Sequence, residues 1–139
     1  MEISDVRRRV HAAIERAKKQ AAERRTRGDE ATRAYDAFLS NVGVPIFRQV
    51  ANVLRADGYL FSVFTPSGSV RLAADRIAEN FIELTLETTG AAPQVLGHSS
   101  HLRGRRIVES EHAIGEPAAL SEEEVLAFVL KELEALVER

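Results

Sequence analysis

Between residues 58 and 111, apolar and polar residues alternate through several short runs that turn residues separate. In one of these runs, Val70 and Leu72 alternate with Arg71. Successive side chains of a β-strand point to opposite faces, so this pattern predicts strands with one buried face and one wet face. Consecutive strands of this kind joined by short turns indicate an antiparallel meander.

The alternating region predicts up to five strands, and the fourth run is the weakest of them. Their expected ranges are 59–65, 69–75, 80–88, 94–98 and 105–114. The first run is apolar on both faces, which favours a central position in the sheet. A turn is expected at 102–104, around Gly104. Charged residues of the wet face, such as Arg71 and Glu83, are expected to pair across neighbouring strands as a surface ladder.

Two helices are expected to cover one face of this sheet. Pro45 opens the first, over 45–57, because its missing N–H costs nothing in a first helical turn. The second spans 121–139. It begins with a capping box in which Ser121 caps the helix and Glu124 reaches back to it.

The N-terminal residues 2–27 predict a further helix, because Ala, Glu, Arg, Lys and Gln dominate and no glycine or proline occurs before Gly28. Gly28 and Asp29 predict a break or a C-cap, after which helix resumes over 30–42 and a turn follows at 41–44. Apolar residues of the first helix recur at steps of three and four and form a narrow stripe. The stripe residues are Ile3, Val6, Val10, Ile14 and Ala17.

These elements predict an α+β fold: an antiparallel four- or five-stranded meander sheet covered on one face by helices, with a projecting N-terminal helix. We expect a basic helical arm over 1–33 and a single α+β domain over 34–139. The arm holds 10 Lys/Arg and 6 Asp/Glu, a net charge of +4, whereas the whole chain carries −2. Two interpretations remain open: the arm attracts the acidic C-terminal segment 117–139, within or between chains, or it binds an acidic partner.

Composition excludes several classes of function. The chain has no cysteine, which rules out disulfides, thiolate catalysis and cysteine-ligated metal clusters. Its apolar runs are too short to span a membrane, and the N-terminus lacks the apolar core of a signal peptide. We therefore expect a cytoplasmic protein without an integral membrane segment.

No catalytic residue, metal site or cofactor is predicted. The segment 97–101 resembles a nucleophile elbow around Ser99, but that motif requires glycine where His101 stands. His98, His101 and His112 suit zinc or iron as residue types, together with Glu109 and Glu111. On a strand, however, His98 and His101 face opposite ways.

A compact basic turn is formed by Arg103, Arg105 and Arg106 around Gly104. Guanidinium groups bind phosphate in a bidentate manner, so this turn and the arm could together hold nucleic acid. The acidic chain as a whole and the lack of aromatic residues among the basic runs argue against that hypothesis.

The main hypothesis is a non-enzymatic interaction or assembly module that acts through the N-terminal helix and an apolar helix face. The stripe of Ile3, Val6, Val10, Ile14 and Ala17 is typical of a coiled-coil seam or of a helix that docks in a partner's groove. A homo-oligomer or a protein partner is therefore expected. Nucleic-acid association is the alternative. A small enzyme or ligand carrier that uses a cleft lined by His98, His101 or Arg106 is the third hypothesis.

Overall fold

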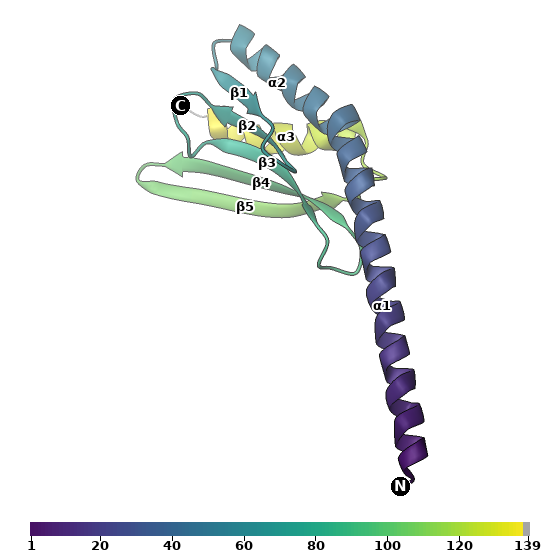
Figure 1. Cartoon of the computed structure of the whole chain (residues 1–139). Coiled ribbons are helices and arrows are strands. Elements are labelled where there is room, and N and C mark those ends of the chain that lie inside the picture. The colour runs from purple at the N-terminus through teal and green to yellow at the C-terminus, as the bar shows by residue number, and fades with distance from the viewer. Residues whose placement is uncertain (138–139) are drawn as a thin grey trace.

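The computed structural model describes residues 1–137 and shows a long helix leading into a sheet and helix domain (Figure 1). The elements in chain order are α1 (Ile3–Phe38), the π-helix η1 (Leu39–Gly43), α2 (Val44–Ala56), β1 (Phe61–Phe64), β2 (Val70–Ala74), β3 (Phe81–Glu87), β4 (Gln94–Arg103), β5 (Arg106–Gly115) and α3 (Glu122–Val137).

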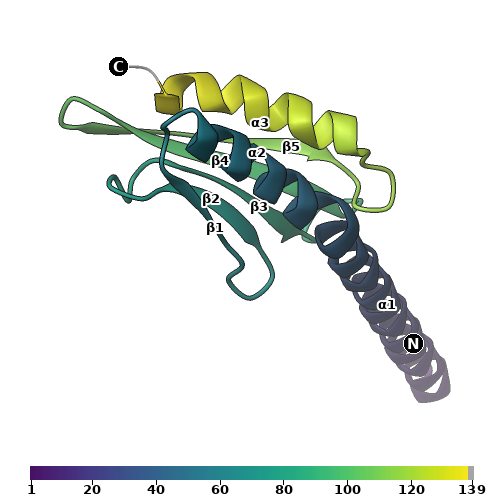
Figure 2. The same ribbon diagram turned by 90° about the horizontal axis from the view of Figure 1, so that it is seen from above.

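The five strands form one antiparallel sheet in the order β1-β2-β3-β4-β5. Each strand pairs with its neighbour in sequence, as short connections between strands favour. The predicted meander and the α+β fold class are therefore confirmed. Helices α2 and α3 lie side by side on one face of the sheet, and no helix of residues 1–137 covers the other face (Figure 2).

The hydrophobic core fills the layer between the two helices and the sheet. Alternate residues of the central strands point into it, as their sequence period predicts. The largest apolar side chains that are fully buried come from α2, β2, β3, β4 and α3: Phe47, Val70, Leu72, Ile82, Leu84, Val95, Val125 and Val129.

The prediction that the first strand is central was wrong, since β1 is an edge strand. Its helix-facing residue Phe61 is buried, whereas Phe64 on the other face is about half exposed. Apolar residues on both faces normally indicate cover on both sides. In β1 the apolar residues on the face away from the helices are left exposed at the edge of the sheet. The local pattern does not show which strands lie beside a given strand.

Strand β4 is longer than predicted and continues to Arg103. The turn accordingly comprises Gly104 and Arg105 instead of residues 102–104. The polar sequence from His98 to His101 does not end the strand, because it remains in register with β5 throughout. Buried Ser99 finds hydrogen-bond partners on β5 and α3, which removes the penalty of placing it there.

The predicted break at Gly28 and Asp29 was also wrong, because α1 runs without interruption for 36 residues, or about 54 Å. Glycine within a helix costs about 1 kcal/mol relative to alanine, which is too little to end a helix flanked by strong helix formers. The Thr32 hydroxyl donates to the Gly28 carbonyl at 3.0 Å. Beyond this point, buried Ala31 and Tyr35 attach the helix to the domain.

The predicted turn at 41–44 is replaced by the π-helix η1, which joins α1 to α2. In it, the Val44 N–H donates to the Leu39 carbonyl, five residues earlier. The reason lies at Pro45, which has no N–H for the carbonyl four residues before it and whose ring would clash there in a regular α-helix. A wider turn accommodates the proline without breaking the helix.

The capping box at Ser121 is confirmed. The Glu124 N–H donates to Ser121 Oγ at 3.2 Å, and the Ser121 N–H donates to Glu124 Oε1 at 3.2 Å. The predicted helix end at residue 139 lies outside the described residues.

Candidate functional site

Helix α1 exposes its predicted apolar stripe. Ile3, Val6, Val10 and Ile14 are 78, 44, 49 and 45% exposed, and Ala17 is exposed as well. Figure 1 shows the cause: the N-terminal half of α1 runs away from the domain, with no other element beside it. An exposed row of large aliphatic side chains is unfavourable in water, and such surfaces commonly mark contact sites.

The exposed stripe lies on the face of α1 that also attaches the helix to the domain. At 100° per residue, Val10, Ala17 and Tyr35 lie within about 20° of one another around the helix axis. Tyr35 is buried, and its hydroxyl donates to the Gly68 carbonyl at 2.8 Å. The face that packs on the sheet therefore continues, uncovered, along the arm.

The predicted basic turn lies at the tip of the β4–β5 hairpin. Arg103, Arg105 and Arg106 are all exposed, and Gly104 has the positive φ of +65° that the turn requires. Arg103 and Arg106 are directly opposite across the two strands, an arrangement of like charges that disfavours pairing. This tip lies at the opposite end of the sheet from α1 (Figures 1 and 2). The arm and the turn do not form one basic surface.

The histidines proposed for a cleft do not converge. His98 is paired with Glu83 and Glu111 on the face without helices, whereas His101, three residues along the same strand, lies on the other face. Arg106 lies beyond both, at the hairpin tip. Among residues 1–137, no group of three or more acidic or histidine side chains is arranged to hold a metal ion.

The face of the sheet without helices carries a chain of polar and aromatic contacts across four strands. The predicted charge ladder is confirmed at Arg71, whose Nε donates to Glu83 Oε2 at 2.5 Å. The same guanidinium lies 3.8 Å from the centroid of Phe81. The Phe81 ring meets His98 edge-on at 5.3 Å, and His98 Nε2 lies 3.6 Å from Glu109 Oε1. These contacts hold side chains in place but bring together no nucleophile and base.

A second polar cluster lies beneath α3 and was not anticipated. The Ser99 hydroxyl donates to Glu132 Oε2 at 2.8 Å, and Ser110 Oγ lies 2.7 Å from Ser99 Oγ. Glu132 Oε1 is 4.0 Å from His112 Nε2. Glu132 lies between Val129 and Leu136 on the buried side of α3. Glu132 follows Val129 by three residues and precedes Leu136 by four, so the helical period places its carboxylate on the buried face. This is the one sequence signal that indicates the cluster.

The order of groups in this cluster is not that of a catalytic triad. A triad places histidine between serine and carboxylate, so that the imidazole removes the serine proton. Here Glu132 lies between Ser99 and His112. Ser99 is buried in the middle of β4, and no strand-to-helix turn exposes it as in a nucleophile elbow. The cluster therefore joins α3 to the β4–β5 hairpin.

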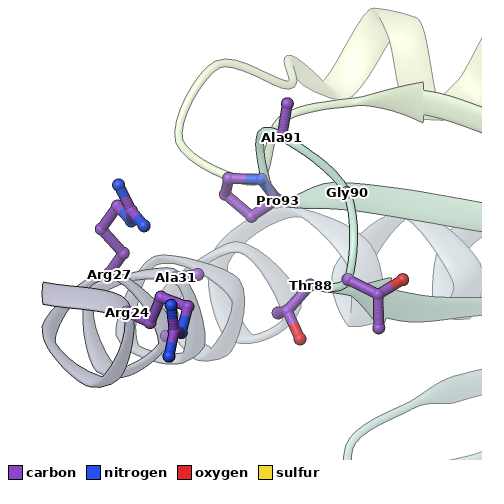
Figure 3. Close-up of a pocket in the computed structure, with 9 residues that line it drawn as sticks. Arg24, Arg27, Ala31, Thr88, Gly90, Ala91 and Pro93 are labelled. Carbon is purple, nitrogen blue, oxygen red and sulfur yellow. The ribbon is translucent and has the colours of Figure 1, made fainter. Parts of the chain in front are cut away.

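A hollow of about 550 Å³ lies between α1 and the loop from Thr88 to Pro93 (Figure 3). Arg24 and Arg27 extend from the helix at one wall, and their guanidinium groups lie apart from each other. Across the hollow, Thr89 donates hydrogen bonds from its hydroxyl and N–H to Glu87 Oε1, which lower the pKa of that carboxyl. Divergent arginines facing a loop tied to a carboxylate do not form an anion clamp.

No helix in the described part of the chain is long and apolar enough to cross a membrane. No protein-family model matches the chain, and no curated protein or solved structure is significantly similar to it.

Proposed function

We propose that the chain is a non-enzymatic assembly module in which two copies associate through the apolar stripe of α1. The observation that carries this proposal is the exposed row from Ile3 to Ile14 on the same helix face as buried Tyr35. One end of this face already packs against protein, and the other end has the same apolar character without a partner.

Steric considerations favour an antiparallel pair of arms. The domain lies on the stripe side of α1, so two parallel arms facing each other would bring both domains into the same space. In an antiparallel pair centred near residue 12, the partner's N-terminus lies beside residue 23 of the first copy. The first residue of α1 that the domain buries is Ala31. The two domains then lie at opposite ends of the assembly.

The sizes of the stripe residues fit the same arrangement. Ala21 continues the spacing of the stripe beyond Ala17, so the apolar side chains become smaller along the arm from Ile3. Antiparallel pairing places Ile3 of one copy against Ala21 of the other, so that a large side chain faces a small one at each end of the seam, as close packing requires. At the centre of the seam, Val10 of one copy faces Ile14 of the other. The steps of 3, 4, 4, 3 and 4 approach an 11-residue period, which suits nearly straight helices.

Charge gives this proposal a specific salt dependence. Each arm carries a net +4, and antiparallel pairing brings Arg7 near Lys18 of the other copy. Added salt screens repulsion between exposed charges, so self-association should strengthen as ionic strength rises. Binding of the arm to an acidic partner would instead weaken as ionic strength rises.

The first experiment is light scattering on the full chain across a range of protein and salt concentrations. We expect a monomer–dimer equilibrium that shifts to monomer when Val10 and Ile14 are both replaced by Ser. The matched control replaces Arg8 and Glu15 by Ser, which leaves the net charge unchanged on the opposite face of the helix. A full chain that stays monomeric at every concentration and salt would overturn the proposal.

The absence of cysteine permits a direct test of orientation. An Ile3→Cys chain mixed with an Ala21→Cys chain should form an intermolecular disulfide if the arms are antiparallel. Ile3→Cys alone should not cross-link, because the two sites would then lie about 27 Å apart along the seam. Efficient cross-linking of Ile3→Cys with itself would contradict the antiparallel arrangement.

The two other hypotheses have less geometric support. A single nucleic-acid ligand would have to extend from the arm to Arg105 at the opposite end of the sheet (Figure 1). An enzyme or ligand carrier would use His98, His101 or Arg106 in a cleft between sheet and helix, and His98 and His101 lie on opposite faces, so they cannot act together in one cleft.

A further inference from the structure

The end of the sheet opposite α1 is built from three chain connections, which we call the distal end. They are the α2–β1 connection (57–60), the β2–β3 loop (75–80) and the β4–β5 tip (102–108). The antiparallel meander brings all three to one end of the sheet, and the hairpin tip extends beyond the other strands (Figures 1 and 2).

The distal end exposes large aliphatic side chains from all three connections. From residue 39 to the end of the described chain, eight large apolar residues are exposed, and five of them belong to this end. They are Leu60, Ile77, Leu102, Ile107 and Val108, each between 40 and 56% exposed. Such concentration at one end differs from the single exposed apolar residues that any protein surface carries.

Backbone hydrogen bonds join the three connections into one surface. The Asp75 N–H donates to the Leu60 carbonyl at 2.9 Å, which ties the first connection to the second. The Leu102 N–H donates to Asn80 Oδ1 at 2.8 Å, which ties the second to the third. Asn80 is itself buried. The apolar side chains are therefore presented together by an ordered scaffold.

The same end is basic. Arg76, Arg103, Arg105 and Arg106 outnumber its acidic residues Asp57 and Glu79. Asp75 lies near Arg76 but is paired directly with Arg55 from α2, which balances its charge, and it also accepts a hydrogen bond from Ser62. The hydrogen bond from Ser62, supported by Arg55, keeps the pKa of Asp75 below its ordinary value.

We propose that the distal end binds the surface of an anionic lipid bilayer. Its aliphatic side chains would enter the boundary between headgroups and acyl chains, while the arginines bind lipid phosphates. Lipid phosphates would also offset the repulsion between Arg103 and Arg106, which lie opposite each other across the hairpin.

A bilayer fits this surface better than nucleic acid does. The exposed apolar residues are aliphatic and give bases no aromatic ring to stack on. They protrude from three separate connections, and a bilayer receives separate side chains without the shape complementarity that a duplex groove or a protein partner requires. The distal end is also remote from the arm, so the proposal does not depend on self-association.

The test is co-sedimentation of the full chain with lipid vesicles. We expect binding to vesicles of phosphatidylcholine mixed with phosphatidylglycerol, weaker binding to phosphatidylcholine alone, and loss of binding at high salt. Arg105→Gln should weaken binding about fivefold. Replacing both Leu102 and Ile107 by Ser should abolish most of it, and circular dichroism should confirm that both variants remain folded.

The arm provides the matched control, because it is itself a basic amphipathic helix. Replacing Arg9 by Gln, or both Arg8 and Glu15 by Ser, should leave vesicle binding within a factor of two or so of the original value if the distal end is responsible. Binding that depends on the arm substitutions and not on the distal ones would overturn the proposal. A chain that does not bind anionic vesicles would also overturn the proposal. The same holds if the chain binds an oligonucleotide through Arg105 and does not bind the vesicles.

Fluorescence supplies a second readout, because the chain contains no tryptophan. In the Ile107→Trp chain, the tryptophan emission should shift to shorter wavelength and be quenched by brominated lipid when anionic vesicles are added. In the Phe64→Trp chain, where the substituted residue is also exposed but lies at the other end of β1, the emission should do neither. An equal response at both positions would contradict insertion of the distal end.

Discussion

Phe128 of α3 lies so close to Gly97 of β4 that a β-carbon at position 97 would be 2.2 Å from the ring Cζ. Only glycine allows the ring to rest on the strand backbone, so this contact sets the separation of α3 from the sheet. Gly97→Ala should therefore lower the free energy of unfolding by about 1–3 kcal/mol. Denaturant titration measures this loss. In a chain that already carries Phe128→Ala, Gly97→Ala should cost less, and the difference between the two losses is the coupling energy of the pair.

Gly28 of α1 should behave in the opposite way. It lies in the middle of a helix with helical φ, and a β-carbon there would meet nothing within 4 Å. Gly28→Ala should stabilise the helix by about 0.5–1 kcal/mol, because alanine loses less conformational entropy on folding. Thermal melts followed by circular dichroism would show a rise in the melting temperature. A decrease would indicate that the helix needs flexibility at this position.

Tyr35 joins α1 to the domain through its hydroxyl, which lies 2.8 Å from the Gly68 carbonyl and 3.2 Å from the Leu84 carbonyl. Tyr35→Phe should cost about 0.5–1.5 kcal/mol, since it leaves buried acceptors without this donor. Urea unfolding measures this loss in the free energy of unfolding. Hydrogen exchange of the last turns of α1 should rise in parallel, and unchanged protection there would mean that packing alone holds the helix.

Tyr35 also predicts a stability loss at alkaline pH. Burial raises the pKa of the phenol above its ordinary value, and the carboxylates of Glu83 and Asp36 raise it further. Above about pH 10 the unfolded chain releases this proton and the folded chain retains it, so stability falls by about 1.4 kcal/mol per pH unit. The Tyr35→Phe chain lacks this term. The stability gap between the two proteins should therefore narrow from pH 9 to 11, and a constant gap would contradict the assignment.

The capping hydrogen bond at Ser121 is expected to stabilise the first turn of α3. Its hydroxyl accepts from the Glu124 N–H at 3.2 Å, so Ser121→Ala should cost about 0.5–2 kcal/mol. Ser121→Asp preserves the acceptor and should be close to neutral. Equal losses in both variants would show that the cap makes no specific contribution.

Much of the fold could be predicted from short-range pattern. The alternation around Val70 and Leu72 and the capping box at Ser121 depend on neighbours within four residues, and the structure agrees with both. The stripe from Ile3 to Ile14 could also be identified from spacing alone. Its exposure could not, because nothing local distinguishes a helix that packs on its own domain from one that leaves it.

The order of elements, the antiparallel meander, and the residues that share a face of each strand and helix could all be predicted from the amino-acid sequence. Those properties follow from backbone period and turn chemistry. The tertiary structure was needed to show that β1 is an edge strand and that the arm and the β4–β5 tip lie at opposite ends of the sheet. Both depend on how segments far apart in the chain pack together, as Tyr35 does against Gly68, and no local pattern encodes that packing. The continuity of α1 through Gly28 was also visible only in the structure, because the cost of one glycine is small enough for its helix-forming neighbours to offset.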